Sequence, residues 1–132
     1  MMNVGELISR KPITLNENIS IKQAAKVMKG ENVGSIIIVD ENNRPLGIVT
    51  ERDIVRAVAD GVPLDSSIST IMTKGLITIT PDKDVTEALL IMYQNNIRHL
   101  VVVDNNGELL GVISIRDAAR ALNLLALDLS FW

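Results

Sequence analysis

Two short segments of the chain carry a hydroxyl and a carboxylate at a spacing that suits nucleotide binding. Residues 47–53 read GIVTERD, and residues 111–117 read GVISIRD, 64 positions later (111 minus 47). In each segment two β-branched residues lead to Thr50 or Ser114, and an aspartate follows three positions on. This is the pattern of a strand that runs directly into a helix. A helix start offers free amides to a phosphate, and a carboxylate can accept hydrogen bonds from ribose hydroxyls.

The same residues also have a purely structural interpretation. Thr50 with Asp53, and Ser114 with Asp117, match the capping pattern in which a hydroxyl and a carboxylate satisfy the amides of a helix start. Capping does not explain why each motif begins with a glycine in the strand. Glycine weakens a strand and often marks the close approach of another backbone or of a ligand. Both interpretations stay open on the sequence alone.

The motif belongs to a longer internal repeat. The same offset aligns Ile13-Thr14 with Ile77-Thr78, Ala24 with Ala88, Met28 with Met92, and Val39-Asp40 with Val103-Asp104. With only two copies of a unit of about 60 residues, we expect a pair packed face to face about a pseudo-twofold axis rather than a solenoid. Each half alone would have difficulty burying a core.

Each copy predicts the element order β-α-β-β-α. In the first copy, a short extended piece at 13–15 precedes a helix that begins at Ser20, which forms a capping box with Gln23. The second copy places Asp84 and Glu87 at the aligned positions. A β-hairpin and a second helix follow. The predicted fold class is therefore α/β of the α+β type. The predicted divisions are repeat 1 at 4–60, a linker at 61–67, repeat 2 at 68–124 and an apolar C-terminal tail at 125–132.

Composition narrows the function classes. The 132 residues are 47% hydrophobic, but the apolar runs are far shorter than the ~20 residues of a membrane span. We therefore expect a soluble protein with no membrane association. The start of the chain has no secretory signal and there is no cysteine, so the expected location is cytoplasmic.

Charge and residue types argue against two further classes. The net charge is −3, with acidic and basic residues interspersed, whereas general nucleic-acid affinity needs clustered Lys and Arg. The chain has one histidine, no cysteine, and no H-E-x-x-H or Walker sequence. We therefore expect no enzyme, no metal site, no required cofactor and no nucleic-acid partner.

The repeated features together resemble those of the cystathionine β-synthase (CBS) domain family, whose tandem pairs are called Bateman modules. The resemblance covers nearly the whole chain. It depends on the paired motifs at 47–53 and 111–117, the Ile-Thr strand openings, the Ala and Met pairs, and the segment NIRHLVVVD at 96–104. Because the pieces share one order and one offset, the chain is similar to a stand-alone CBS pair.

The resemblance implies two ligand sites. The first contains Ile13, Thr14, Gly47, Thr50, Asp53, Arg98 and His99, and the second contains Gly34, Ser35, Ile77, Thr78, Gly111, Ser114 and Asp117. In the family the aspartate holds the ribose, the hydroxyl lies near ribose or phosphate, and the adenine lies against the Ile-Thr strand. The resemblance also implies that Arg98 and His99 face a phosphate held by Asp53. Their alternatives are a solvated surface arginine and a hydrogen-bonded structural histidine.

The two copies differ in charge before the core strand, where the first has Gly34-Ser35 and the second has Arg98-His99. A guanidinium can bind phosphate through two parallel hydrogen bonds. We therefore expect AMP, ADP or ATP at the Asp53 site. We expect the Asp117 site to bind an uncharged or cationic adenosyl compound such as S-adenosylmethionine, or none.

Two hypotheses for function follow. The first is an energy- or metabolite-sensing regulatory module that binds an adenosine nucleotide and transmits its occupancy to an unidentified protein partner by a change of conformation or assembly. The alternative is a constitutive homodimerisation scaffold without a ligand. The tail at 125–132 packs on its own module or across a homodimer under one interpretation, and docks another protein under the other.

Overall fold

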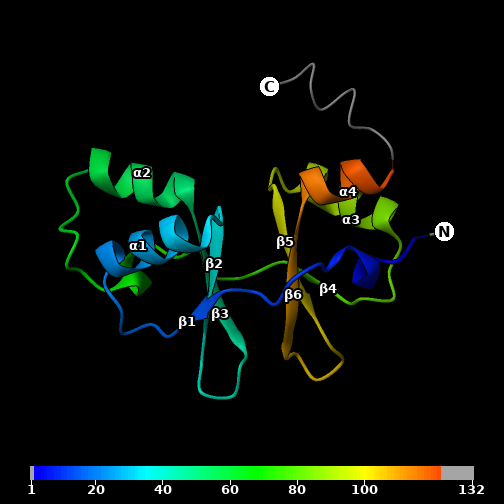
Figure 1. Ribbon diagram of the computed structural model, residues 1–132, viewed down its shortest axis with the longest axis horizontal. Coiled ribbons are helices and arrows are strands. Elements are labelled where there is room, and N and C mark those ends of the chain that lie inside the picture. The colour runs from blue at the N-terminus through cyan, green and yellow to red at the C-terminus, as the bar shows by residue number, and fades with distance from the viewer. Residues whose placement is uncertain (1, 123–132) are drawn as a thin grey trace. The chain divides into compact units, whose positions relative to one another are not determined.

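The computed structural model describes residues 2–122; residues 1 and 123–132, and with them the predicted tail, lie outside the described part. Its elements in chain order are η1 (Val4–Leu7), β1 (Thr14–Leu15), α1 (Ile21–Glu31), β2 (Ser35–Val39), β3 (Pro45–Thr50), α2 (Glu51–Ala59), η2 (Ile68–Thr70), β4 (Thr78–Ile79), α3 (Val85–Gln94), β5 (His99–Val103), β6 (Leu109–Ser114) and α4 (Ile115–Ala121) (Figure 1). The predicted mixed α+β class and the order β-α-β-β-α, found twice, are confirmed. The short 3-10 turns η1 and η2 were not predicted.

The chain forms two compact units, which we call the β1–β3 unit and the β4–β6 unit. The first comprises Pro12–Leu76, and the second comprises the described residues of 1–11 and 77–132. In the β1–β3 unit, β2 is the central strand, parallel to β1 and antiparallel to β3, with Ile37 opposite Ile48. In the β4–β6 unit, β5 occupies the same place between β4 and β6, with Val101 opposite Val112.

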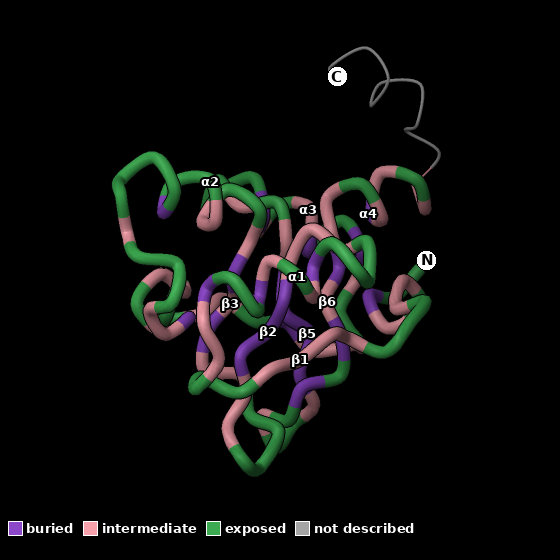
Figure 2. Tube along the Cα trace, turned by 60° about the vertical axis from the view of Figure 1, so that its left-hand side comes forward, coloured by how far each residue is buried: buried purple, intermediate pink, exposed green. Residues whose placement is uncertain are grey.

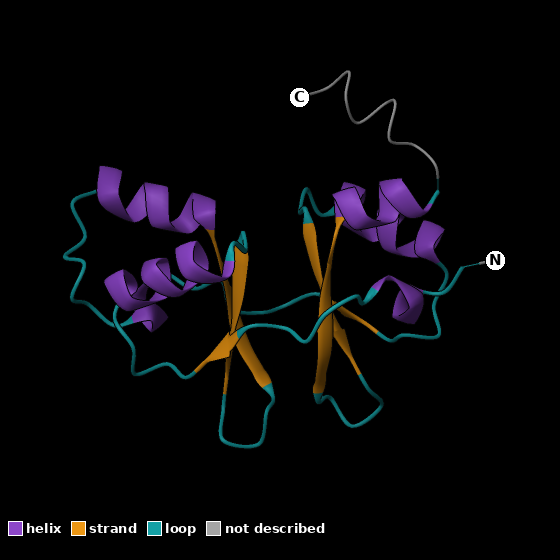
Figure 3. Cartoon of the chain, in the orientation of Figure 1, coloured by secondary structure: helices purple, strands orange, loops and turns teal. Residues whose placement is uncertain are grey.

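Helices cover one face of each sheet. In Figure 3, α1 and α2 lie on the same side of the β1–β3 sheet, and α3 and α4 lie on one side of the β4–β6 sheet. The buried residues are concentrated in the central strands β2 and β5 (Figure 2). The core of the β1–β3 unit joins Ala24 and Met28 of α1 to Ile36 and Ile38 of β2. The equivalent residues of the β4–β6 unit, Ala88, Met92, Leu100 and Val102, form the same core.

Each unit is completed by a leading segment that comes from the other repeat in sequence. The segment 2–9, which precedes the first repeat's strands, bonds to the β4–β6 unit through Val4 N to Lys83 O at 2.8 Å and Val85 N to Met2 O at 3.1 Å. The segment 64–73 bonds to the β1–β3 unit through Ile68 N to Ile19 O at 2.8 Å. We call these two segments the leading segments. The compact units and the contiguous repeats of the sequence are therefore different divisions of the chain.

One of the two predicted helix caps is confirmed, and the other prediction is wrong. The predicted box of α1 is present, because Ser20 N donates to Gln23 Oε1 at 2.8 Å and Gln23 N donates to Ser20 Oγ at 3.1 Å. The predicted pairing of Asp84 with Glu87 is wrong. Asp84 Oδ1 instead accepts from the amide of Thr86 at 2.8 Å and from its hydroxyl at 2.7 Å. The Asp84 carboxylate thus caps the helix through the residue two positions after it and not through the residue three positions after it.

None of the described helices is long and apolar enough to cross a membrane. The longest of them, α1, has 11 residues.

Candidate functional site

The first hydroxyl-aspartate motif lies at the junction of β3 and α2. Thr50 ends the strand with an extended backbone, and Glu51 begins the helix. Asp53 Oδ2 accepts two hydrogen bonds from Thr50, from its amide at 2.9 Å and from its hydroxyl at 3.2 Å. The carboxylate is therefore held against the end of the strand by the residue that caps the helix.

The second motif forms the equivalent junction of β6 and α4. Ser114 N donates to Asp117 Oδ2 at 2.9 Å, and Asp117 N donates to Ser114 Oγ at 3.0 Å. The capping interpretation of both motifs is thus correct as a description of the bonds. In residues 2–122, the bonds to Asp53 and Asp117 use only Oδ2. A ribose can therefore bond to Oδ1 without any loss of the cap.

The glycines that open the motifs are explained by the leading segments. A Cβ atom on Gly47 would lie 2.7 Å from Met72 Sδ and 3.0 Å from the carbonyl oxygen of Thr73. A Cβ atom on Gly111 would lie 2.9 Å from Ile8 Cγ2. The close approach that these glycines permit is made by the protein's own chain. Ligand contact by Gly47 and Gly111 stays a prediction.

The strand register brings several predicted site residues of the β1–β3 unit together. Ser35 lies opposite Thr50, and the carbonyl of Gly34 accepts from Glu51 N at 3.1 Å. Thr14 lies opposite Ile37 on the neighbouring strand, and Ile13 O accepts from Ile37 N at 3.1 Å. The start of β2, the end of β3 and strand β1 therefore meet near one helix start.

The β4–β6 unit repeats this arrangement with different residues. His99 lies opposite Ser114, the carbonyl of Arg98 accepts from Ile115 N at 2.8 Å, and Thr78 lies opposite Val101. Ile77 precedes Thr78 and packs against this unit's core. Within their own units, Arg98 and His99 thus neighbour Ser114, and Gly34 and Ser35 neighbour Thr50. The assignment of Arg98 and His99 to the Asp53 site, and of Gly34 and Ser35 to the Asp117 site, stays a prediction.

Glu51 is a residue that the sequence reasoning missed. It lies between Thr50 and Arg52, it is exposed, and the residue at the aligned position of the second repeat is Ile115. The repeat offset could have found it, because a change from carboxylate to isoleucine alters the charge beside the motif. Glu51 also lines a cavity of about 430 Å³ between α1 and α2, together with Asn32 and Val33.

A second cavity borders Asp117. It has a volume of about 240 Å³ and is lined by Glu6 and Leu7 of η1 and by Asp117 and Arg120 of α4. The leading segment therefore forms one wall beside the aspartate of this unit. Among the described residues, no cluster of three or more His, Cys, Asp or Glu side chains is placed to hold a metal ion.

Comparison with known proteins identifies the family. The model of the CBS domain matches residues 4–60 and again residues 68–124. The chain belongs to the CBS-domain family. Its two matches make it a tandem CBS protein.

The curated relatives that match most of this chain are longer than it is. An uncharacterised 17.7 kDa protein of Acidianus ambivalens is 45% identical over 119 residues, which are 90% of this chain and 72% of that protein. The chain spans smaller shares, 60% and 22%, of two longer relatives.

Two solved structures are similar throughout. The CBS domain protein PAE2072 from Pyrobaculum aerophilum, complexed with AMP, has a TM-score of 0.84 and 39% identity, with 88% of this chain and 89% of that one covered. The CBS domain pair of protein MJ0100, in complex with 5′-methylthioadenosine and S-adenosyl-L-methionine, has a TM-score of 0.86 and 33% identity, covering 93% and 97%. Both of these CBS-pair structures hold adenosine-type ligands, which supports a ligand-binding regulatory module.

Proposed function

We propose that the protein is a regulatory module that senses adenosine nucleotides, with one ligand site at each hydroxyl-aspartate junction. The observation that carries the proposal is the repeated junction itself, in which an aspartate is fixed by Oδ2 at a helix start. A fixed carboxylate is already oriented for a ribose, so little further ordering is needed when a ligand binds. The proposed ligand is AMP, ADP or ATP, or S-adenosylmethionine, and no resident cofactor is needed.

The proposed roles follow the chemistry of each residue. Asp53 and Asp117 accept hydrogen bonds from the ribose, and Thr50 and Ser114 lie beside the sugar or its phosphate. The Ile13-Thr14 and Ile77-Thr78 pairs support the adenine, because the three aromatic residues of the chain are too few and too scattered to stack it. Arg98 and His99 supply the cations for a phosphate at the Asp53 site, and Gly34 and Ser35 take their place at the Asp117 site.

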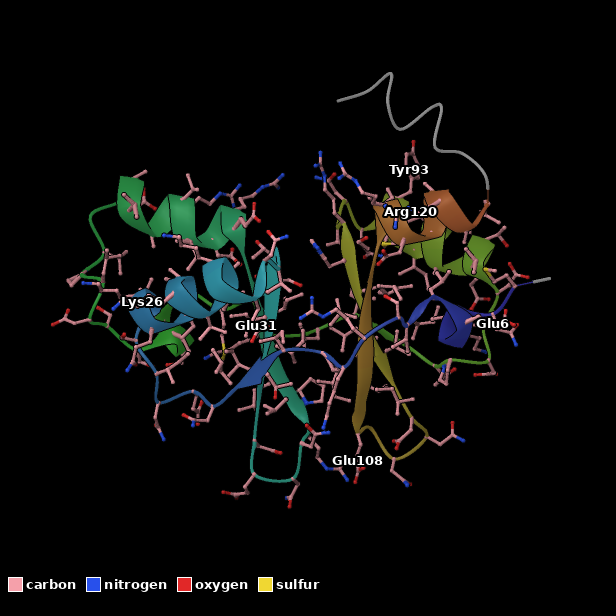
Figure 4. All side chains as sticks on the ribbon, in the orientation of Figure 1. Glu6, Lys26, Glu31, Tyr93, Glu108 and Arg120 are labelled. Carbon is pink, nitrogen blue, oxygen red and sulfur yellow. The ribbon has the colours of Figure 1, made fainter. Side chains whose placement is uncertain are left out.

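Transmission requires that the ligand favour one arrangement of the protein over another. We propose that a protein partner detects this change, and that a second copy of the chain pairs through the exposed helix faces. Val55 on α2 is 65% exposed, and Tyr93 on α3 is 83% exposed and points away from its helix (Figure 4). These two side chains are our candidates for that pairing surface. The lack of cysteine suits a reducing cytoplasm.

Calorimetric titration with AMP, ATP, S-adenosylmethionine and adenosine tests the proposal. The informative variants are Asp53→Asn and Asp117→Asn, because asparagine keeps an oxygen for the cap and removes the charge that binds ribose. Asp60→Asn, at the far end of α2, is the matched control. We expect each site variant to weaken binding at one site by at least about tenfold, the loss of one charged hydrogen bond, and the control to bind as the wild type does.

The alternative function is a scaffold that dimerises without a ligand. It predicts that none of the four compounds binds to the wild-type protein and that its assembly, measured by light scattering, does not change when they are added. Binding that survives both substitutions unchanged would also contradict the proposed sites.

A further inference from the structure

A carboxylate without an ionic partner lies beside one of the two proposed junctions. Glu51 is the first residue of α2, and its amide donates to Gly34 O at 3.1 Å. Its Oε1 lies 3.3 Å from the position that a Cβ atom on Gly34 would take. Among residues 2–122, the Glu51 carboxylate takes part in no hydrogen bond or ion pair. Its negative charge is therefore not neutralised by a neighbouring side chain of the described chain.

The equivalent corner of the other unit has the opposite charge. There Ile115 begins α4, and its amide donates to Arg98 O at 2.8 Å. Glu51 with Gly34 in one unit and Ile115 with Arg98 in the other are the same two positions of the repeat, joined by the same backbone hydrogen bond. Both residues of the pair differ between the two units. One corner pairs a glutamate with a glycine, and the other pairs an isoleucine with an arginine.

We propose that Glu51 determines the charge of the adenosine compound that the protein accepts beside Gly34, which the proposed function assigns to the Asp117 site; this inference rests on the proposed function. The carboxylate repels a phosphate that approaches the start of β2, and it favours an adenosine compound that is uncharged or positively charged at that position. Arg98 has the opposite effect at its own corner. The same backbone hydrogen bond forms both corners, but Ile115 packs against its core whereas Glu51 is exposed. The charges of Glu51 and Arg98 therefore distinguish the ligands.

The size of the effect follows from the exposure of Glu51. Water screens an exposed charge, and pairwise effects between exposed charges are small, so we expect a change of about threefold in affinity. The same screening makes the effect depend on salt, because the Debye length falls from about 10 Å at 0.1 M to about 3 Å at 1 M.

A structural role for Glu51 makes a different prediction. An acidic residue in the first turn of a helix interacts favourably with the helix dipole. Asp53 already places a carboxylate in that turn. If Glu51 served only the dipole, its loss would lower the thermal stability slightly and would change the affinities for charged and uncharged ligands equally.

The test compares the binding of AMP and adenosine to Glu51→Gln, with Glu41→Gln as the control. Glu41 is another exposed acid of the same unit, in the hairpin loop between β2 and β3. Calorimetry at about 0.1 M and about 1 M salt gives the ratio of the two dissociation constants. We expect Glu51→Gln to shift the ratio about threefold in favour of AMP at low salt, with a smaller shift at high salt and none in the control.

Two results would overturn the proposal while the proposed function stands. One is an unchanged ratio in Glu51→Gln, and the other is an equal shift in Glu41→Gln. If the wild type binds neither AMP nor adenosine, the proposed function itself is wrong and the inference fails with it. Thermal unfolding of both variants verifies that they are folded.

Discussion

The β1–β3 unit and the β4–β6 unit have the same backbone arrangement but differ in the charged side chains at equivalent positions. Their strand registers, the hydrogen bond at the start of the central strand, and the bond from the Thr50 or Ser114 amide to the aspartate recur at aligned positions. The residues at the same corner do not recur, since the exposed Glu51 is replaced by the half-buried Ile115, and the half-buried Gly34 by the exposed Arg98. Buried positions keep apolar residues and helix caps keep a hydroxyl or a carboxylate, whereas exposed residues vary more freely. The differences between the units therefore point to ligand choice, and the similarities point to the fold.

Each leading segment supplies a core residue to the unit that the other repeat forms. Val4 and Ile68 are aligned by the repeat offset, and both have no exposed surface. Val4 packs in the core of the β4–β6 unit, and Ile68 packs in that of the β1–β3 unit. Neither contiguous repeat therefore contains all of its own core, and each depends on a segment that precedes the other repeat.

Removal of either of these two buried side chains should have the largest effect on stability. Ile68→Ala should destabilise the protein by about 2–5 kcal/mol, because it removes a fully buried side chain and leaves a cavity. Val4→Ala removes less and should cost roughly 1.5–3 kcal/mol. Urea unfolding measures both values, and hydrogen exchange shows where protection is lost.

The location of the lost protection tests the exchange of segments. Ile68→Ala should increase amide exchange in 12–60, which precedes Ile68 in the chain, rather than in 78–121, which follows it. Val4→Ala should increase exchange in 78–121 rather than in the neighbouring strand β1. If each substitution affected the repeat that directly follows it in sequence, the division into these two units would be incorrect.

Substitution of the two glycines that open the motifs should have the next largest effect on stability, and this effect should differ between the two units. Gly47→Ala brings a Cβ against the Met72 side chain and the backbone oxygen of Thr73, so the backbone itself must shift. Gly111→Ala meets only side-chain atoms of Ile8. We expect a cost of about 1–3 kcal/mol for Gly47→Ala and a smaller one for Gly111→Ala, from urea unfolding.

Double substitutions distinguish these two clashes. Adding Ile8→Ala should relieve most of the strain of Gly111→Ala, whereas adding Met72→Ala should relieve only part of that of Gly47→Ala, because the Thr73 oxygen remains. The coupling energy of each cycle is the quantity to compare. Equal coupling in the two cycles would show that the backbone contact at Gly47 is unimportant.

Sequence reasoning could predict the elements because they recur with one offset. Helix α1 was predicted from apolar spacing and from Ser20 with Gln23, and both its start and its cap are confirmed. The leading segments could not be predicted, because η1 has four residues and η2 has three, too few to show a periodic pattern. Their bonding partners lie in the other half of the chain, and local propensity says nothing about such contacts.

The candidate site could be predicted to the same extent. The caps formed by Asp53 and Asp117 follow from residue spacing, and the structure shows their bonds. Glu51 lies inside the motif but matches no capping or packing pattern, so only a position-by-position comparison of the two repeats distinguishes it. The sequence also named Glu87 as the partner of Asp84, because the three-residue spacing of a capping box was applied where Thr86 lies closer.

The smallest expected effect concerns that cap. Hydrogen bonds from the Thr86 hydroxyl and amide lower the pKa of Asp84 below its usual value, whereas the equivalent cap of α1 is Ser20, which does not titrate. A lowered pKa in the folded state adds stability above the unfolded pKa, and this contribution is lost as the pH falls below about 4. Acid should therefore loosen the start of α3 before that of α1.

The variant Asp84→Ser makes the two caps alike and tests this difference. Thermal unfolding from pH 7 to pH 3 should show a smaller loss of stability in the variant than in the wild type. Asp82, whose pKa is lowered by a hydrogen bond from Thr80, is present in both proteins and does not affect the comparison. Parallel decline of the two curves would mean that the Asp84 cap adds no pH-dependent stability, and would contradict the expected difference between the two helix starts.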